Sequence, residues 1–177
     1  MPRTKKLETR KQDILQSAFE CFVQFGYSKT SLDLIAQKTG ISRPLIYQHF
    51  KDKEDLFACM IEERFSERYA LAEQSLLSNS SKREKLLKLV EIIVLKDWSL
   101  ISNSFHGAEF FSELLNTLPA FEEKYRKKFI QMATSVLQNE DLAEVFRFSL
   151  TGLTSDNPSM ELLHKRINIL VDCVCHY

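Results

Sequence analysis

Apolar residues recur along this chain at the three- and four-residue spacing of an α-helix. No stretch alternates apolar and polar side chains for long enough to form a β-strand. Only four Gly and four Pro occur in 177 residues, and most of them stand where a helix is expected to begin or end. In the first helical segment Ile14, Ala18 and Phe22 share one face, and Gly26 ends the pattern. The sequence therefore predicts an all-α protein of about nine helices.

The charges are unevenly distributed along the chain. The 24 Lys and Arg balance the 24 Asp and Glu, which argues against a protein that is basic over its whole surface. Residues 1–53 hold ten basic and five acidic residues, a net charge of +5, so residues 54–177 carry −5. A basic N-terminal part favours contact with a polyanion. We expect two domains, an N-terminal one over residues 1–53 and a C-terminal helical one over residues 54–177.

Two short helical segments joined at Gly40 follow the first helix. Thr30 and Asp33 are expected to form a capping box for a helix that runs through Lys38, and Ser42 to cap the next one. The small side chain of Ala36 lets the second helix pack across the first. This arrangement predicts a helix-turn-helix, whose second helix enters the major groove of DNA.

The side chains expected to contact DNA lie on the second of these helices and at the start of the first. Arg43 can pair with guanine and Gln48 with adenine through two hydrogen bonds each, whereas nearby hydroxyl, imidazole and ammonium groups suit phosphate. Pro44 has the alternative role of starting the helix, and Tyr47 that of packing. The predicted DNA-binding set is Thr30, Ser31, Ser42, Arg43, Pro44, Tyr47, Gln48, His49 and Lys53.

The run from Thr30 to Phe57, TSLDLIAQKTGISRPLIYQHFKDKEDLF, resembles the TetR family of bacterial transcriptional regulators. The upstream stretches 14–18 and 22–30 fit that family's first helix and turn, so the resemblance covers roughly residues 8–60. It implies a homodimeric DNA-binding protein with a C-terminal effector and dimerisation domain, most often a repressor released by a small molecule. The helix over residues 42–50 would then be the recognition helix. The sequence Pro-Leu-Ile at 44–46 departs from the family, in which many members have small residues there.

Aromatic residues concentrate in the C-terminal part and allow two interpretations. Small-molecule sites are mainly apolar with a few polar groups, and the pair His106-Gly107 indicates irregular backbone near a cavity. The alternative is a plain hydrophobic core, which is the commoner fate of such residues. The candidate ligand-binding set is Trp98, Phe105, His106, Phe110, Phe129, Met132 and Phe146.

The last helix, from Ser159 toward Tyr177, carries apolar residues on two faces. One face repeats at spacings of four, three and four, and Leu162, Ile169 and Cys173 extend a second face. A helix that is apolar on both sides needs its own core and a partner, so we predict a four-helix interface between two copies, shared with the helix over residues 142–153. The candidate interface residues are Leu163, Ile167, Leu170 and Val174.

An enzyme is the main alternative class. Glu161 and His164 form a Glu-x-x-His element, but a di-iron site needs two, and no other histidine follows a glutamate at that spacing. No zinc spacing, nucleophile elbow or phosphate loop occurs, so we expect no cofactor. A helical interaction module without DNA binding is the second alternative, which the basic N-terminal part argues against. The lack of a signal peptide or a membrane-spanning stretch predicts a cytoplasmic protein with free thiols.

Overall fold

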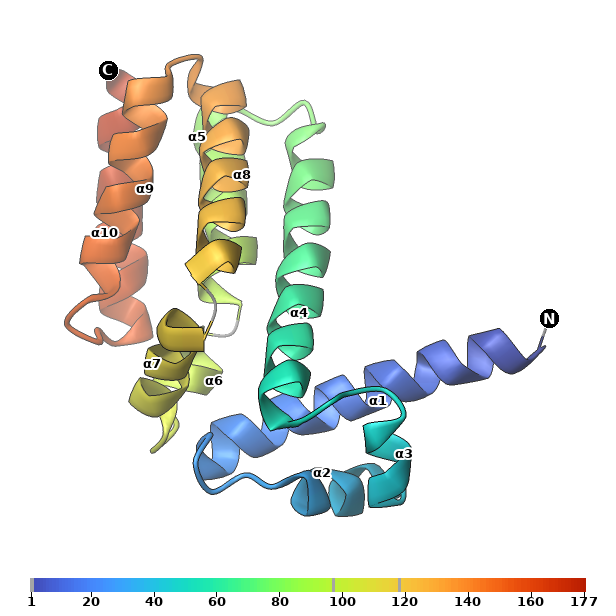
Figure 1. The fold of residues 1–177 in the computed structure, drawn as a ribbon. Helices are drawn as coiled ribbons and strands as arrows, with labels where there is room; N and C mark the ends of the chain where they lie inside the picture. Colours follow the sequence, from blue (N-terminus) through green and yellow to red (C-terminus); the bar gives the residue numbers. More distant parts are fainter. Residues whose placement is uncertain (1, 97, 118) are drawn as a thin grey trace. The chain divides into compact units, whose positions relative to one another are not determined.

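The computed structural model describes residues 2–96, 98–117 and 119–177, and within them the chain forms helices and no β-strand. This confirms the predicted all-α class. The elements in chain order (Figure 1) are α1 (Pro2–Phe25), α2 (Leu32–Thr39), α3 (Arg43–Tyr47), α4 (Lys53–Leu76), α5 (Lys82–Val90), the π-helical η1 (Glu91–Leu95), α6 (Trp98–Ser102), α7 (Gly107–Thr117), α8 (Pro119–Leu137), α9 (Glu140–Thr154) and α10 (Met160–His176).

The chain divides into two compact units, and α4 contributes to both. The first unit comprises Met1–Arg64 and Leu100–Pro119, and the second comprises Phe65–Ser99 and Ala120–Tyr177. The sequence suggested a boundary after residue 53, whereas the N-terminal unit extends into α4 and also takes in α7. A segment more than thirty residues further along the chain therefore belongs to the unit that holds the helix-turn-helix.

The first unit is built around the apolar face of α1. Ile14, Ala18 and Phe22 are fully buried, as their helical spacing predicted. The ring of Phe57 on α4 lies edge-on to that of Phe22, with centroids 5.1 Å apart, and 5.6 Å from that of Phe110 on α7. Aromatic rings from three helices thus hold α1, α4 and α7 together.

The two short helices begin and end largely where the sequence placed them, with one correction. Gly40 ends α2 in the left-handed conformation, with φ of +71°. The predicted capping by Thr30 is wrong, because the N-cap of α2 is Ser31, whose hydroxyl accepts a hydrogen bond from the Leu34 N–H. The third helix, α3, spans only Arg43–Tyr47, shorter than the predicted 42–50.

The second unit consists of the C-terminal half of α4 with α5, η1, α8, α9 and α10. The last helix, α10, packs against both α9 and α5. The Tyr69 hydroxyl on α4 donates a hydrogen bond of 2.9 Å to the backbone oxygen of Tyr125 on α8, and their ring centroids lie 4.7 Å apart. Both side chains are buried, so this contact fixes α4 against α8 within the unit.

Three of the four predicted dimer residues lie in the core of the second unit. Leu163, Ile167 and Val174 are buried within the single chain, and Leu170 is half-buried. This face of α10 is therefore already used by the chain's own packing. The outward-facing apolar residues are those on the other stripe of α10 and on α9, namely Val145, Phe148, Leu162 and Ile169.

Two helical stretches of the chain are interrupted. Helices α6 and α7 are separated by a turn in which the Ser104 N–H bonds the Ile101 oxygen and the Gly107 N–H bonds the Ser104 oxygen. A side chain at Gly107 would collide with the Ile101 carbonyl, which explains the glycine. The helix that begins at Lys82 changes at Glu91 from the α-helix α5 to the π-helical η1.

Candidate functional site

The short helix α3 presents polar side chains on its outer face. Arg43, Pro44, Tyr47 and Gln48 are exposed, whereas Ile46 beneath them is fully buried. Of the remaining predicted residues, Ser31 and Ser42 are also exposed and His49 is half-buried. The hydroxyl of Ser42 makes no capping hydrogen bond, so it remains available to an external acceptor or donor. The helix and the residues that flank it therefore display most of the predicted DNA-binding residues.

The guanidinium group of Arg43 is held by two neighbours. It donates hydrogen bonds of 2.8 Å to the Asp33 carboxylate on α2 and of 3.1 Å to the Tyr47 hydroxyl one turn further along α3. The Tyr47 hydroxyl and the Asp33 charge raise the pKa of Arg43 above its ordinary value. The Arg43 and Asp33 side chains are about half exposed or more, at 51% and 63%. Exposed pairs of this kind exchange partners at little cost.

Lys53 is bound to the turn between α1 and α2. Its ammonium group donates a 2.9 Å hydrogen bond to the Tyr27 backbone oxygen and lies 4.3 Å from the centre of the Tyr27 ring. Two other lysines of the first unit, Lys29 and Lys51, are exposed and make no ion pair within the described part of the chain. The sequence pattern did not single them out, because nothing local distinguishes a free lysine from a paired one.

Thr30 lies inside the first unit. Its side chain is 2% exposed, and its hydroxyl donates hydrogen bonds of 2.7 Å to the Gly26 oxygen and 3.1 Å to the Cys21 oxygen. Its backbone N–H also bonds Gly26, at 3.2 Å. With both donors turned inward, Thr30 fastens the end of α1 to the start of α2. The predicted phosphate contact through this hydroxyl does not fit this geometry.

A contact that the sequence did not suggest joins α7 to the turn after α1. Glu109 accepts a 2.7 Å hydrogen bond from the Ser28 N–H, and its other oxygen lies 3.4 Å from His106 Nδ1. The Ser28 backbone N–H and, less strongly, His106 lower the pKa of the Glu109 carboxyl. Ser104 in the same turn donates a hydrogen bond to the Val23 backbone oxygen. The side chains of Ser104 and Glu109 thus hold the end of α1 and the turn that follows it.

The predicted aromatic ligand-binding set is divided between the two compact units. Phe110 belongs to the core of the first unit, and Phe105 there is 94% exposed. Trp98 and Met132 are buried in the second unit, where Phe129 and Phe146 stack with centroids 6.1 Å apart. The alternative interpretation, that most of these residues form core, describes them better. The irregular backbone expected at His106-Gly107 is present as the turn before α7.

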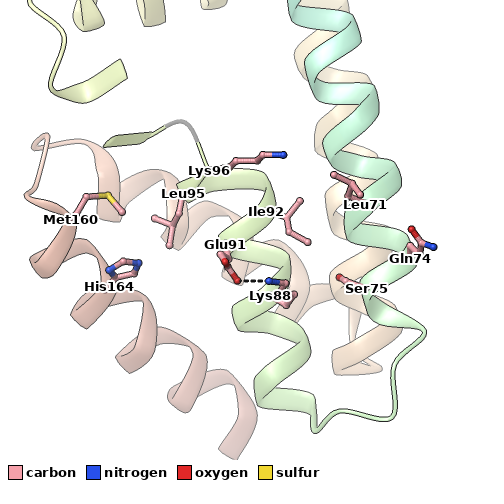
Figure 2. A pocket seen from close by; sticks show the side chains of 10 residues that line it. All are labelled: Leu71, Gln74, Ser75, Lys88, Glu91, Ile92, Leu95, Lys96, Met160 and His164. Carbon is pink, nitrogen blue, oxygen red and sulfur yellow. Dashed lines mark hydrogen bonds and ion pairs between the residues drawn. The ribbon is translucent and has the colours of Figure 1, made fainter. Parts of the chain in front are cut away.

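The second unit instead has a trough along α5 and η1, which the sequence did not predict. It has a volume of about 650 Å³ and lies between α4 and the beginning of α10 (Figure 2). Its lining combines apolar side chains with polar and charged ones and consists of Leu71, Gln74, Ser75, Lys88, Glu91, Ile92, Leu95, Lys96, Met160 and His164.

Within the residues that the structure describes, no cluster of three or more His, Cys, Asp or Glu side chains could hold a metal ion. Glu161 and His164, the one Glu-x-x-His element, are both exposed on α10. The described helices include none that is long and apolar enough to cross a membrane. All four cysteines are free thiols.

Comparison with known proteins places the helix-turn-helix among regulators. The family model described as bacterial regulatory proteins, tetR family, matches residues 14–60. The transcriptional activator FasR of Mycolicibacterium smegmatis is 31% identical over 84 residues, which cover 48% of this chain and 38% of FasR. The transcriptional repressor AcnR of Corynebacterium diphtheriae is 26% identical over 170 residues, which cover 94% of this chain and 80% of AcnR. This chain therefore matches well under half the length of FasR but most of AcnR.

Solved structures share the fold at low sequence identity. The SmeT–triclosan complex superposes with a TM-score of 0.65 at 15% identity, over 95% of this chain and 90% of the SmeT chain. SmeT is the repressor of the SmeDEF multidrug efflux pump of Stenotrophomonas maltophilia. At this identity the likeness concerns the fold, and it extends over both compact units.

Proposed function

We propose that this chain, a member of the TetR family of bacterial regulatory proteins, is a sequence-specific, homodimeric DNA-binding repressor. A small hydrophobic effector relieves its DNA binding. The family consists of transcriptional regulators and not of enzymes. Its place of action is the cytoplasm, where bacterial operator DNA lies.

The observation that carries DNA binding is the exposed face of α3. A five-residue helix with one buried anchor, Ile46, would contribute little to the core, yet Arg43 and Tyr47 on this helix and Gln48 directly after it are exposed to solvent. Arg43 and Gln48 are the side chains that read guanine and adenine by paired hydrogen bonds. Lys29 and Lys51, exposed and unpaired within the described residues, add phosphate contacts that orient the helix.

The proposed dimer interface uses the outer faces of α9 and α10. Phe148 is 61% exposed, Val145 57% and Ile169 56%, and Leu162 extends the same apolar surface. Large exposed apolar side chains gathered on two neighbouring helices are typical of a protein–protein interface. Two copies related by a twofold axis would bury these residues in a four-helix arrangement and present two α3 helices to a near-palindromic operator.

Repression and effector release are supported by the relatives. AcnR, which covers most of this chain, is named a repressor, and SmeT, a repressor of an efflux pump, was captured with triclosan. FasR, named an activator, aligns over 48% of this chain. The longer match therefore favours repression.

Selection of bound fragments from random DNA tests the proposal. We expect a near-palindrome with half-site centres about one helical turn apart, and light scattering should report a dimer at micromolar concentration. Absence of any enriched sequence would refute specific DNA binding, and a monomer would refute the proposed interface.

The variant Arg43→Ala tests base reading on the selected operator. It should weaken binding roughly tenfold to hundredfold and relax the base preference at one position per half-site. The matched control is Arg83→Ala, because Arg83 forms a similar exposed pair with Asp172, at 2.6 Å, but lies on α5. Arg83→Ala should leave binding unchanged. Equal losses in both variants, or a uniform loss on all sequences for Arg43→Ala, would contradict direct readout.

A further inference from the structure

The trough of the second unit has the size of a small-molecule site. Its volume of about 650 Å³ lies within the range of roughly 300–1,000 Å³ that ligand pockets occupy. Its floor is the outer face of α5 and η1, one wall is α4 with Leu71 and Ser75, and the other is the first turns of α10 with Met160 and His164 (Figure 2). All of the lining residues belong to the second compact unit.

The π-helical segment coincides with the trough. η1 spans Glu91–Leu95, and three of its five residues, Glu91, Ile92 and Leu95, line the trough. A π-helical turn within an α-helix is rare and is frequently found at functional sites. An uninterrupted α-helix would turn these side chains to other directions. The irregular backbone therefore shapes the floor of the trough.

The charges of the trough favour an anion. Lys88 and Glu91 neutralise each other through a 2.8 Å ion pair. Lys96, directly after η1, is exposed, and within the described chain its ammonium group makes no hydrogen bond or ion pair. His164 adds a ring nitrogen from the opposite wall, and among the residues that the structure describes no carboxylate other than that of Glu91 lines the trough. The remaining lining gives one uncompensated cation beside an apolar surface.

From this arrangement we propose that the trough binds an aliphatic monocarboxylate, whose carboxylate pairs with Lys96 and whose hydrocarbon chain lies against Leu71, Ile92 and Leu95. The apolar side chains take up the chain, because burying hydrocarbon removes it from water. Lys96 supplies the charge complementarity that selects an acid over an alcohol or an amine. The identification of this ligand as the effector rests on the function proposed above. Its binding in the trough is independent of that function.

Binding of octanoate to the full-length chain in the absence of DNA tests the site. Isothermal titration should show octanoate binding more tightly than 1-octanol, and octylammonium binding more weakly than either. Lys96→Met should weaken octanoate binding roughly fivefold, as expected for one partly exposed charge pair, and leave 1-octanol binding unchanged. The matched control is Lys165→Met, which removes an exposed lysine of α10 outside the trough and should have no effect.

Ile92→Trp provides a second, steric test, since the larger ring fills the floor of the trough and should abolish octanoate binding. Circular dichroism shows whether each variant is folded. If Ile92→Trp does not fold, the effect of Lys96→Met alone tests the proposed site. The proposal is overturned if octanoate does not bind, if 1-octanol binds as tightly, or if Lys96→Met and Lys165→Met behave alike. Operator binding is measured separately, so a chain that binds its operator but not octanoate would refute the site and leave the regulator proposal standing.

Discussion

Two glycines with the same backbone conformation but different surroundings allow the contribution of the contact between Glu109 and the turn after α1 to the free energy of unfolding to be measured. Gly26 and Gly40 end α1 and α2 with φ of +81° and +71°. A Cβ atom at Gly40 would meet nothing within 4 Å. A Cβ atom at Gly26 would run into the carboxylate of Glu109 and lie 2.9 Å from Nδ1 of His106. Alanine at either position has the same backbone strain, and only at Gly26 does it disturb α7.

The expected magnitudes follow from these surroundings. An alanine in the left-handed region costs about 1–2 kcal/mol, and the lower entropy of the unfolded chain offsets about 0.4–1 kcal/mol of this. Gly40→Ala should therefore destabilise the protein by about 1 kcal/mol. Gly26→Ala must also displace Glu109 from the Ser28 N–H, which it binds at 2.7 Å, at a further cost of about 1 kcal/mol. We expect about 2 kcal/mol for Gly26→Ala.

Urea unfolding followed by far-ultraviolet circular dichroism measures both variants in the wild-type and Glu109→Ala backgrounds. In the Glu109→Ala background the carboxylate is gone, so the cost of Gly26→Ala should fall toward that of Gly40→Ala, and the latter should not change. Equal costs of the two glycine substitutions in the wild-type background would refute the reasoning. So would a difference that persists in full without Glu109, because the extra cost would then lie in the turn itself.

Three further predictions concern the same unit and use the same unfolding measurement. Phe57→Ala should cost about 3–5 kcal/mol, because its ring is fully buried among aromatic neighbours, whereas Phe105→Ala, at a side chain 94% exposed, should cost less than about 0.5 kcal/mol; similar costs would contradict the described core. Thr30→Val should cost about 1 kcal/mol by removing a buried hydroxyl that donates to two carbonyls, and no change would mean that these bonds are weak. The lowered pKa of Glu109, due mainly to the Ser28 N–H, means that the unfolded chain binds this proton more readily, so stability should decline as the pH falls below about 5; Glu109→Gln should flatten that decline, and parallel profiles would argue against the contact.

The helix-turn-helix could be predicted because its determinants are local. Gly40 adopts the left-handed conformation that ends α2, and the apolar spacing that leads to Ile46 sets which face is buried. The capping residue was misassigned by one position, since Thr30 and Ser31 carry the same functional group. What separates them is the burial of Thr30 against the end of α1, a tertiary contact that adjacent residues do not reveal.

The dimer and ligand residues could not be predicted to the same extent. On α10 two apolar stripes satisfy the helical period, and periodicity alone does not say which of them faces the chain's own core. The stripe with Leu163 and Ile167 is buried in the core, whereas the stripe with Leu162 and Ile169 is exposed. A trough is space left over by packing, and its position depends on how side chains from three helices meet. Aromatic content identifies residues that fill space, which is why it led to the core.

The basic N-terminal part is less free to bind DNA than its net charge of +5 suggests. Arg43 pairs with Asp33, Lys38 pairs with Glu20 at 2.9 Å, and Lys53 bonds the Tyr27 carbonyl. Each of these partners must be exchanged for a phosphate or a base before the cation contributes, and the exchange subtracts from the affinity gained. The internal partners also hold the side chains in place before DNA arrives, which reduces the entropy lost on binding. Because exposed ion pairs are weak, the exchange subtracts only a small part of the affinity, whereas the unpaired lysines supply attraction to any phosphate without that cost.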